Sequence, residues 1–301
     1  MEKVKHLYEP NWFKEFGFIS FVAIVFLIAC FTKSALVSIF CFGLSQVVAG
    51  WLAHSMNHSR HEKLHKMGNI VGPLLGGLSA PWWGYKHNMH HMFTNSTRFD
   101  DDIKHEYFTP LYPFLYVKWR FDAFISSLTT LNIVDLICMS INYYFISRQK
   151  LIYFFVGILI GGFYSANLLL GNHEREKRYN NEIKDDFIEH QIITCRNYDY
   201  NGLFWLTIMG GMQYQTEHHL FPQIPFYNLP TAKKIIKEEL SVIGKEVIIG
   251  DVLWSWKSIK RYHIKLFKFL WNSWLSLNSH LSLSHSSLYF ASFPFITSYS
   301  N

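Results

Sequence analysis

Histidine is concentrated in three short clusters of the 301-residue sequence. They read His54-Ser-Met-Asn-His58, His87-Asn-Met-His90-His91 and Gln215-Thr-Glu-His218-His219. Imidazole nitrogen binds iron, copper and zinc well. Histidines four residues apart lie on one face of a helix, so the first two clusters each predict a pair of rings that face the same way. The three clusters together predict a metal site.

His173 ends a long apolar run and brings the candidate histidine ligands to eight. A structural zinc needs four ligands, often cysteine, and a catalytic zinc needs three. Eight histidines without cysteine exceed either need, so we favour two redox-active non-haem irons. His61 and His65 extend the first cluster by helical turns, and we expect them at the surface or in support of the ligands.

The composition indicates a membrane protein. Half of the residues are hydrophobic and 17% are charged, against roughly 25% charged in soluble domains. The net charge of +6 suits a cytosol-facing membrane surface, and no basic run interleaved with aromatics indicates a nucleic-acid partner. The four cysteines lie far apart and predict neither a disulfide framework nor a zinc site.

Runs of about 20 residues with at most one charged side chain predict membrane-spanning helices. They lie at about 16–32, 34–53, 123–147 and 151–172, behind a short cytosolic N-terminus at 1–15. We expect the first run to be a retained anchor and not a signal peptide. The third run contains Asp135, for which a functional and a purely structural role are both open.

The run at 67–85 is also uncharged, but its five glycines and two prolines make a poor continuous helix. A crossing there would also put the first two histidine clusters on opposite faces of the membrane. We therefore predict a re-entrant or interfacial segment buried against protein. The expected fold is an all-α integral membrane protein, with about four spans and a helical cap that holds the metal site.

Basic residues are distributed unevenly along this arrangement. The two short turns between spans hold only Lys33, Arg148 and Lys150, so the side that bears the histidines is expected to face the cytosol. The main domain would cover 16–262. The remainder, 263–301, is a tail rich in serine and aromatic residues, and its last part has no charged side chain.

The three clusters match the histidine boxes HxxxH, HxxHH and QxxHH, and the sequence resembles the membrane fatty acid desaturases over roughly residues 45–230. The glutamine that opens the third box is typical of their front-end branch, the delta-5 and delta-6 acyl and delta-8 sphingolipid enzymes. Flanking residues match as well: Trp82-Trp83, Asp100-Asp101-Asp102-Ile103, Gly210-Gly211 and Leu220-Phe221-Pro222.

This resemblance implies O₂-dependent desaturation of a long-chain acyl lipid or acyl-CoA at two non-haem irons. It assigns no catalytic residue beyond the metal ligands, which would be His54, His58, His87, His90, His91, His173, Gln215, His218 and His219. Gln215 would bind directly or through water. A fused cytochrome b5 motif, His-Pro-Gly-Gly, is absent, so a separate cytochrome b5 or ferredoxin is expected to supply electrons. In a eukaryote the location would be the endoplasmic reticulum membrane.

Two residues depart from the family pattern. Ser55 stands where an aspartate is usual, and losing a carboxylate that orients a ligand ring could lower metal affinity or activity. Phe226 stands where an arginine is often found. Three alternatives stay open: a sphingolipid desaturase, a lipid hydroxylase or ketolase on the same scaffold, and a non-enzymatic metal transporter or sensor. Hydroxylases generally carry histidine in place of Gln215, and a transporter would need histidines or carboxylates inside its spans, where only Asp135 is found.

Overall fold

The structure is a computed structural model that describes residues 2–100, 102, 112–173, 178–179 and 186–250. All of them belong to one compact unit, Met1–Lys257. The tail expected at 263–301 lies outside the described residues. The elements in the described part are helices, except for a parallel pair of two-residue strands, β1 (Asn197–Tyr198) and β2 (Ile249–Gly250). The all-α class expected from the sequence is thus confirmed.

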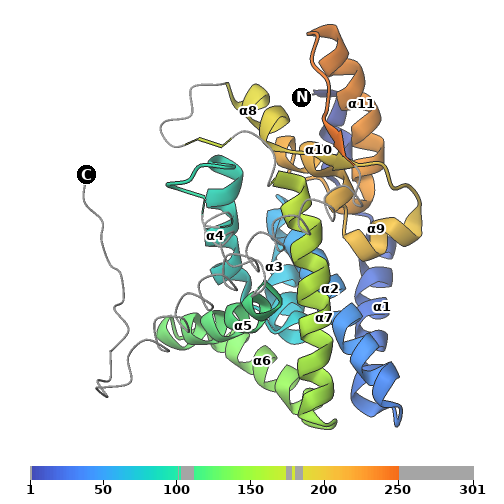
Figure 1. The fold of residues 1–301 in the computed structure, drawn as a ribbon, viewed down its shortest axis with the longest axis vertical. Helices are drawn as coiled ribbons and strands as arrows, with labels where there is room; N and C mark the ends of the chain where they lie inside the picture. The colour runs from blue at the N-terminus through green and yellow to red at the C-terminus, as the bar shows by residue number, and fades with distance from the viewer. Residues whose placement is uncertain (1, 101, 103–111, 174–177, 180–185, 251–301) are drawn as a thin grey trace, which may run out of the picture. The chain divides into compact units, whose positions relative to one another are not determined.

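Three long helices are apolar enough to cross a membrane: α1 (Trp12–Phe31), α2 (Ala35–His58) and α7 (Leu151–His173) (Figure 1). Small residues bring α2 and α7 close together. A Cβ added at Gly43 would lie 2.8 Å from the Gly157 carbonyl oxygen, which is the close backbone approach that glycine permits between membrane helices. Phe13 and Leu36 expose most of their side chains, as a lipid-facing surface requires.

The prediction of one continuous span at 123–147 is wrong. The structure has two helices there, α5 (Tyr112–Thr129) and α6 (Ile133–Ile146), with Leu131 at φ 52° in the turn between them. The Asn132 side chain accepts a hydrogen bond from the Asp135 backbone N–H and so starts a new helix. Helix α6 has only 14 residues, fewer than a span needs. Within the described residues the candidate spans number three, and α5 lies across α7 (Figure 1).

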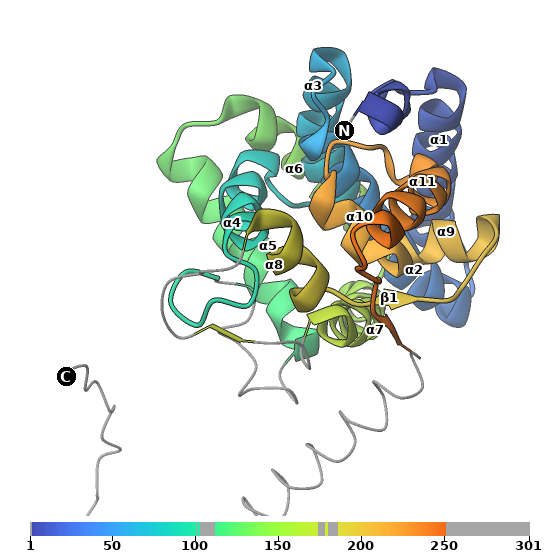
Figure 2. The same ribbon diagram turned by 90° about the horizontal axis from the view of Figure 1, so that it is seen from above.

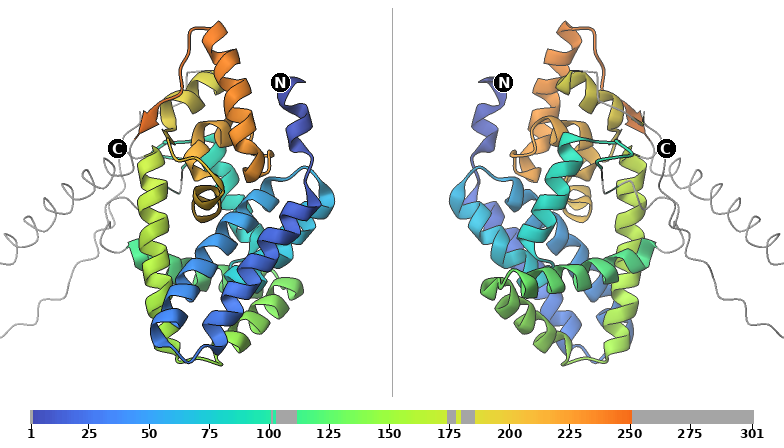
Figure 3. Two further views of the ribbon diagram at one scale, coloured as in Figure 1. Left: turned by 90° about the vertical axis from the view of Figure 1, so that its right-hand side faces the viewer. Right: turned by 90° about the vertical axis from the view of Figure 1, so that its left-hand side faces the viewer.

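The two short turns that connect these helices lie at the same end of the unit. Gln149, in the turn before α7, donates a hydrogen bond from Nε2 to the Thr32 carbonyl oxygen at 2.8 Å, in the turn between α1 and α2. His54 and His58 lie at the other end of α2, and His173 ends α7. Figure 3 shows the two turns at the bottom of the view and the opposite ends of α2 and α7 above them. The histidines therefore lie far from both turns.

The segment at 67–85 is broken into pieces. Helix α3 (Glu62–Val71) continues into one turn of π-helix, η2 (Gly72–Gly76), and α4 (Ala80–Met92) follows after a turn. Gly77 ends η2 at φ 62°, a left-handed conformation that favours glycine. His58 lies before this segment and His87 just after it, and their rings are neighbours. The chain therefore reverses direction between them.

The remaining helices cover the end that bears the histidines, as seen from above in Figure 2. They are η1 (Glu2–Tyr8), α8 (Phe187–Thr194), α9 (Leu203–Met209), η4 (Met212–Tyr214), α10 (Gln215–Leu220), η5 (Phe226–Asn228) and α11 (Leu229–Val242). The Tyr227 hydroxyl donates to the Glu15 carboxylate at 2.7 Å. The Asn228 amide donates to the Leu7 carbonyl oxygen at 2.9 Å. Both bonds fix the N-terminal residues to this cap.

Candidate metal centre

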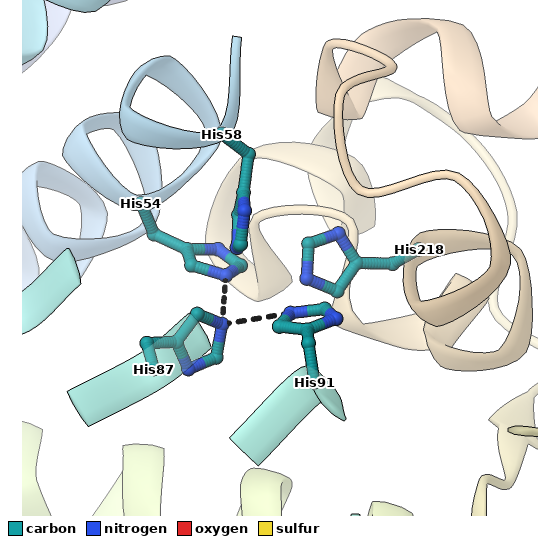
Figure 4. A group of neighbouring side chains, drawn as sticks. All are labelled: His54, His58, His87, His91 and His218. Carbon is teal, nitrogen blue, oxygen red and sulfur yellow. Dashed lines mark hydrogen bonds between the residues drawn. The ribbon is translucent and has the colours of Figure 1, made fainter. Parts of the chain in front are cut away.

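Five histidine rings from three helices converge in a first group. His54 and His58 come from α2, His87 and His91 from α4, and His218 from α10, and one ligand atom of each lies within 4.8 Å of the others (Figure 4). The Nε2 atom of His87 lies 2.7 Å from that of His54 and 3.0 Å from that of His91. Five nitrogens that face one small volume are a donor set for a metal ion.

A second group of three rings lies next to the first. His90 comes from α4, His173 from the end of α7 and His219 from α10, again with ligand atoms within 4.8 Å. The side-chain nitrogen of Gln215 lies 2.9 Å from His173 Nε2. All nine candidate residues named from the sequence are therefore brought together, in two groups.

Three polar groups orient the rings of the second group through their Nδ1 atoms. His90 Nδ1 lies 2.9 Å from Asp100 Oδ2, His173 Nδ1 donates to the Thr194 carbonyl oxygen at 2.9 Å, and His219 Nδ1 donates to Gln191 Oε1 at 2.9 Å. Such bonds fix the tautomer, so that Nε2 is free to bind metal. The sequence flagged Asp100 only as a flanking residue, and it carried no signal for Gln191 or Thr194.

Histidines expected outside the centre lie outside both groups. His61 packs edge-on against Trp12, with ring centroids 5.3 Å apart. His65 places Nδ1 at 3.0 Å from the Asn57 carbonyl oxygen. Asp135, left open by the sequence, accepts a hydrogen bond from the Ser127 hydroxyl at 3.0 Å. This bond ties α6 to α5, which is a structural role.

The charge state of the buried rings suits metal binding. Burial lowers the pKa values of His87, His91, His218 and His219 well below the usual value, and neighbouring imidazoles lower them further. These rings are therefore neutral near pH 7 and offer a nitrogen lone pair.

Hydrogen bonding gives an independent test of whether metal fits. The Nε2 atoms of His58, His218 and His219 are buried without a hydrogen-bond partner, as is Oε1 of Gln215. Each such atom costs about 1–3 kcal/mol when left unsatisfied. Metal ions at the centres of the two groups would satisfy these atoms, so the residues present fit two metals.

An apolar cavity of about 140 Å³ opens from the two groups into the helix bundle. It begins at His54, His87 and His173 and extends between α2, α5 and α7 as far as Val47 and Gly162. A second pocket, of about 260 Å³, shares His54 and His87 with the first. Asn57 lines both spaces, and His65, Asn69 and Asn88 line the second alone. The first histidine group thus borders two spaces, and three asparagine side chains line the second.

Comparison with known proteins identifies the family. The model of the fatty acid desaturase family matches residues 32–247, which include both histidine groups. The chain belongs to the fatty acid desaturase family.

Several curated desaturases are similar to this chain. The Delta(5) fatty acid desaturase fat-4 of Caenorhabditis elegans is 26% identical over 73% of this chain and 61% of its own length. The Delta(6)-fatty-acid desaturase fat-3 of the same organism is 28% identical over 63% of this chain and 55% of its own length. The Delta 8-(E)-sphingolipid desaturase of Lachancea kluyveri is 23% identical over 79% and 53%. The chain therefore spans between half and about three fifths of the length of these relatives.

The paired glycines before the third desaturase box have a steric cause. Gly210 and Gly211 have φ of 60° and 84°. A Cβ at Gly210 would lie 2.2 Å from that of Trp51, and one at Gly211 would lie 2.9 Å from that of Phe226. Only glycine lets the chain turn here and bring α10 against α2, where His218 reaches the first group.

The two departures from the desaturase pattern contact each other. The Ser55 hydroxyl accepts a hydrogen bond from the Phe226 backbone N–H at 3.2 Å, and the Phe226 ring packs on Phe18 with centroids 4.8 Å apart. Ser55 thus ties α2 to the segment that follows α10. Ser55 therefore helps to position α2, which carries the first box, against the segment that follows the third box.

Proposed function

We propose that this chain introduces a double bond into a long-chain acyl group in an O₂-dependent reaction. One observation carries the proposal: two adjacent groups of five and three histidines contribute His54, His87, His90 and His173 to the lining of an apolar cavity between helices. Membership of the fatty acid desaturase family supports it.

The histidines are proposed to hold two non-haem irons. His54, His58, His87, His91 and His218 would hold one iron, and His90, His173 and His219, with Gln215 beside them, would hold the other. When bound, the irons supply the O₂-dependent redox chemistry that attack on an unactivated C–H bond needs. In the net reaction two adjacent methylenes lose one hydrogen each. O₂ takes up these two hydrogens with two electrons and two protons, which gives two waters.

The side chains around the irons position the substrate and exclude water. The apolar cavity would hold the acyl chain extended past the histidines, so that one pair of methylenes lies beside them. The second pocket at the same histidines would take the polar end of the substrate, because three asparagine amides are part of its lining. The acyl carrier would be CoA or a glycerolipid. A ceramide is the alternative, which the similarity to a sphingolipid desaturase supports.

The electron donor is proposed to be a separate cytochrome b5 or ferredoxin, and the location the endoplasmic reticulum membrane. The centre would face the cytosol. The distribution of basic residues supports this orientation, since the two turns at the opposite end hold only Lys33, Arg148 and Lys150.

Expression in yeast with supplied fatty acids tests the proposal. We expect lipids that have lost two hydrogens, with the double bond located by mass spectrometry. A hydroxylase on the same scaffold would give lipids that have gained one oxygen, and a metal transporter would give no new lipid.

The variants His91→Ala and His218→Ala test whether formation of the product depends on the first histidine group. Each removes one ring of the first group, so we expect product to disappear while the protein remains in the membrane fraction. His61→Ala, outside both groups, serves as the matched control and should retain product. Undiminished product from either ligand variant would refute the assignment.

A further inference from the structure

A buried arginine lies behind the apolar cavity. Arg120, on α5, is only 4% exposed. Its guanidinium donates to Gln46 Oε1 at 2.5 Å, to Asn142 Oδ1 at 2.9 Å and to the Gly76 carbonyl oxygen. All three partners are neutral. A buried charge held by neutral groups is costly, so this arrangement needs a reason.

The arginine belongs to a network that holds the end of η2. Three consecutive carbonyl oxygens end this helix, and each accepts a hydrogen bond from a different neighbouring helix. Asn142 on α6 donates to Leu74 at 2.8 Å, Gln46 on α2 donates to Leu75 at 2.9 Å, and Arg120 donates to Gly76. The carbonyl end of a helix carries partial negative charge, which stabilises the guanidinium. The rings of Tyr143 and Phe154, 5.1–5.5 Å from it, add to this.

The same network forms the inner end of the cavity. Gly76 lines the cavity and so does Tyr116, which lies one turn before Arg120 on α5. The Tyr116 hydroxyl donates to the Gln46 carbonyl oxygen at 2.9 Å. The side chains that hold η2 thus also hold the cavity wall opposite the histidines.

The distance from the histidines to this end can be gauged along the helices. Val47 lies seven residues before His54 on α2, and Gly162 lies eleven before His173 on α7. At 1.5 Å per residue these separations are about 10 Å and about 16 Å. Substrate atoms beyond the histidines therefore have a limited length of cavity to occupy.

We propose that Arg120, with Gln46, Asn142 and Tyr116, fixes the depth of the cavity and so limits the length of acyl chain that can extend past the histidines. This inference rests on the proposed function. Arg120 and its amide partners are positioning residues, because they act through Tyr116 and η2. Tyr116 is the side chain that the end of the acyl chain would meet.

The inference is tested by expressing the whole chain in yeast and measuring the chain length of the desaturated products. Cells receive an equimolar mixture of fatty acids of graded length and equal unsaturation, and the ratio of long to short desaturated products is measured. Tyr116→Ala deepens the cavity and should raise this ratio about tenfold, the effect of one or two methylenes in a close-fitting pocket. Gly50→Ala should lower it, because the added methyl enters the cavity with only the Tyr116 hydroxyl nearby, at 3.8 Å.

Arg120→Lys tests the network itself. Lysine keeps the charge but cannot reach all three acceptors in a fixed plane, so the ratio should rise as in Tyr116→Ala. If this variant does not accumulate in the membrane, Asn142→Ala takes its place. Lys118→Ala, on the exposed face of α5 where Lys118 pairs with Asp122, should leave the ratio unchanged.

The outcomes separate the two proposals. No desaturated lipid from the unaltered chain would reject the proposed function. Product in all variants with an unchanged length ratio would reject only the inference, and leave the network as mere support for the fold.

Discussion

His90 belongs to a different histidine group from His87 and His91, although all three lie on α4. With 3.6 residues per turn, His91 projects about 40° to one side of His87 and His90 about 60° to the other, so the adjacent rings of His90 and His91 diverge by about 100°. The HxxHH spacing therefore gives the first group two rings and the second group one. A single helix therefore supplies rings to both groups and holds them side by side.

The two groups should respond differently to the loss of one ring. Removing His58 leaves four histidines in the first group, whereas removing His173 leaves two and Gln215 in the second. We expect purified His173→Ala to hold about one iron per chain and His58→Ala to hold close to two, because two imidazoles bind a divalent metal more weakly than four. Elemental analysis of the purified proteins measures this.

His61→Ala provides the baseline for these metal measurements, because His61 packs against Trp12 and lies outside both groups. Equal iron loss in the two ligand variants would contradict a division into a five-histidine and a three-histidine site.

The residues that form the two histidine groups were predictable from the sequence, but the polar groups that orient their rings were not. Spacing alone shows that His87 and His91 share a face, because the period of a helix is known. Gln191 and Thr194 reach His219 and His173 from α8, and no local pattern links these positions. For Ser55 the sequence predicted only the loss of a carboxylate that could orient a ligand ring, and the bond between its hydroxyl and Phe226 could not be foreseen. Contacts between distant segments decide such roles.

At the scale of elements, the absence of charge did not locate the turn inside 123–147. Asp135 is the only charged residue of this run, and the polar stretch at 126–132, Ser-Ser-Leu-Thr-Thr-Leu-Asn, in which the turn lies, carries no charge. A local signal existed: Asn132-Ile-Val-Asp135 has the spacing of a helix start, with a capping side chain and an acid three residues later. The broken segment at 67–85 was foreseen because glycine and proline report directly on backbone conformation.

The turn at Gly77 predicts a contrast between two glycines of the same segment. A Cβ at Gly77 would lie 2.1 Å from the Arg120 guanidinium, at a positive φ. Gly77→Ala should therefore cost at least about 1–3 kcal/mol for the backbone alone and displace Arg120. Gly84, within α4, has nothing within 4 Å of an added Cβ. Gly84→Ala should stabilise by about 0.5–1 kcal/mol.

Unfolding of the two glycine variants in detergent, followed by circular dichroism, measures this contrast. We expect a lower midpoint temperature for Gly77→Ala and a higher one for Gly84→Ala. A stable Gly77→Ala would show that the end of η2 does not require the left-handed conformation.

For the whole molecule, the placement of the turns makes the topology testable by cysteine labelling. The four native cysteines are all buried, so background labelling should be low. Lys33 and Arg148 lie in turns joined by the bond from Gln149 to Thr32, whereas Lys66 and Lys237 lie on α3 and α11, near the histidine end. In sealed microsomes, a membrane-impermeant maleimide added outside should label Lys66→Cys and Lys237→Cys, and label Lys33→Cys and Arg148→Cys only after the membrane is opened. Labelling of Lys33→Cys and Arg148→Cys from opposite sides of the membrane would refute the arrangement. The structure places both turns at the same end of the unit, so both cysteines should lie on the same side.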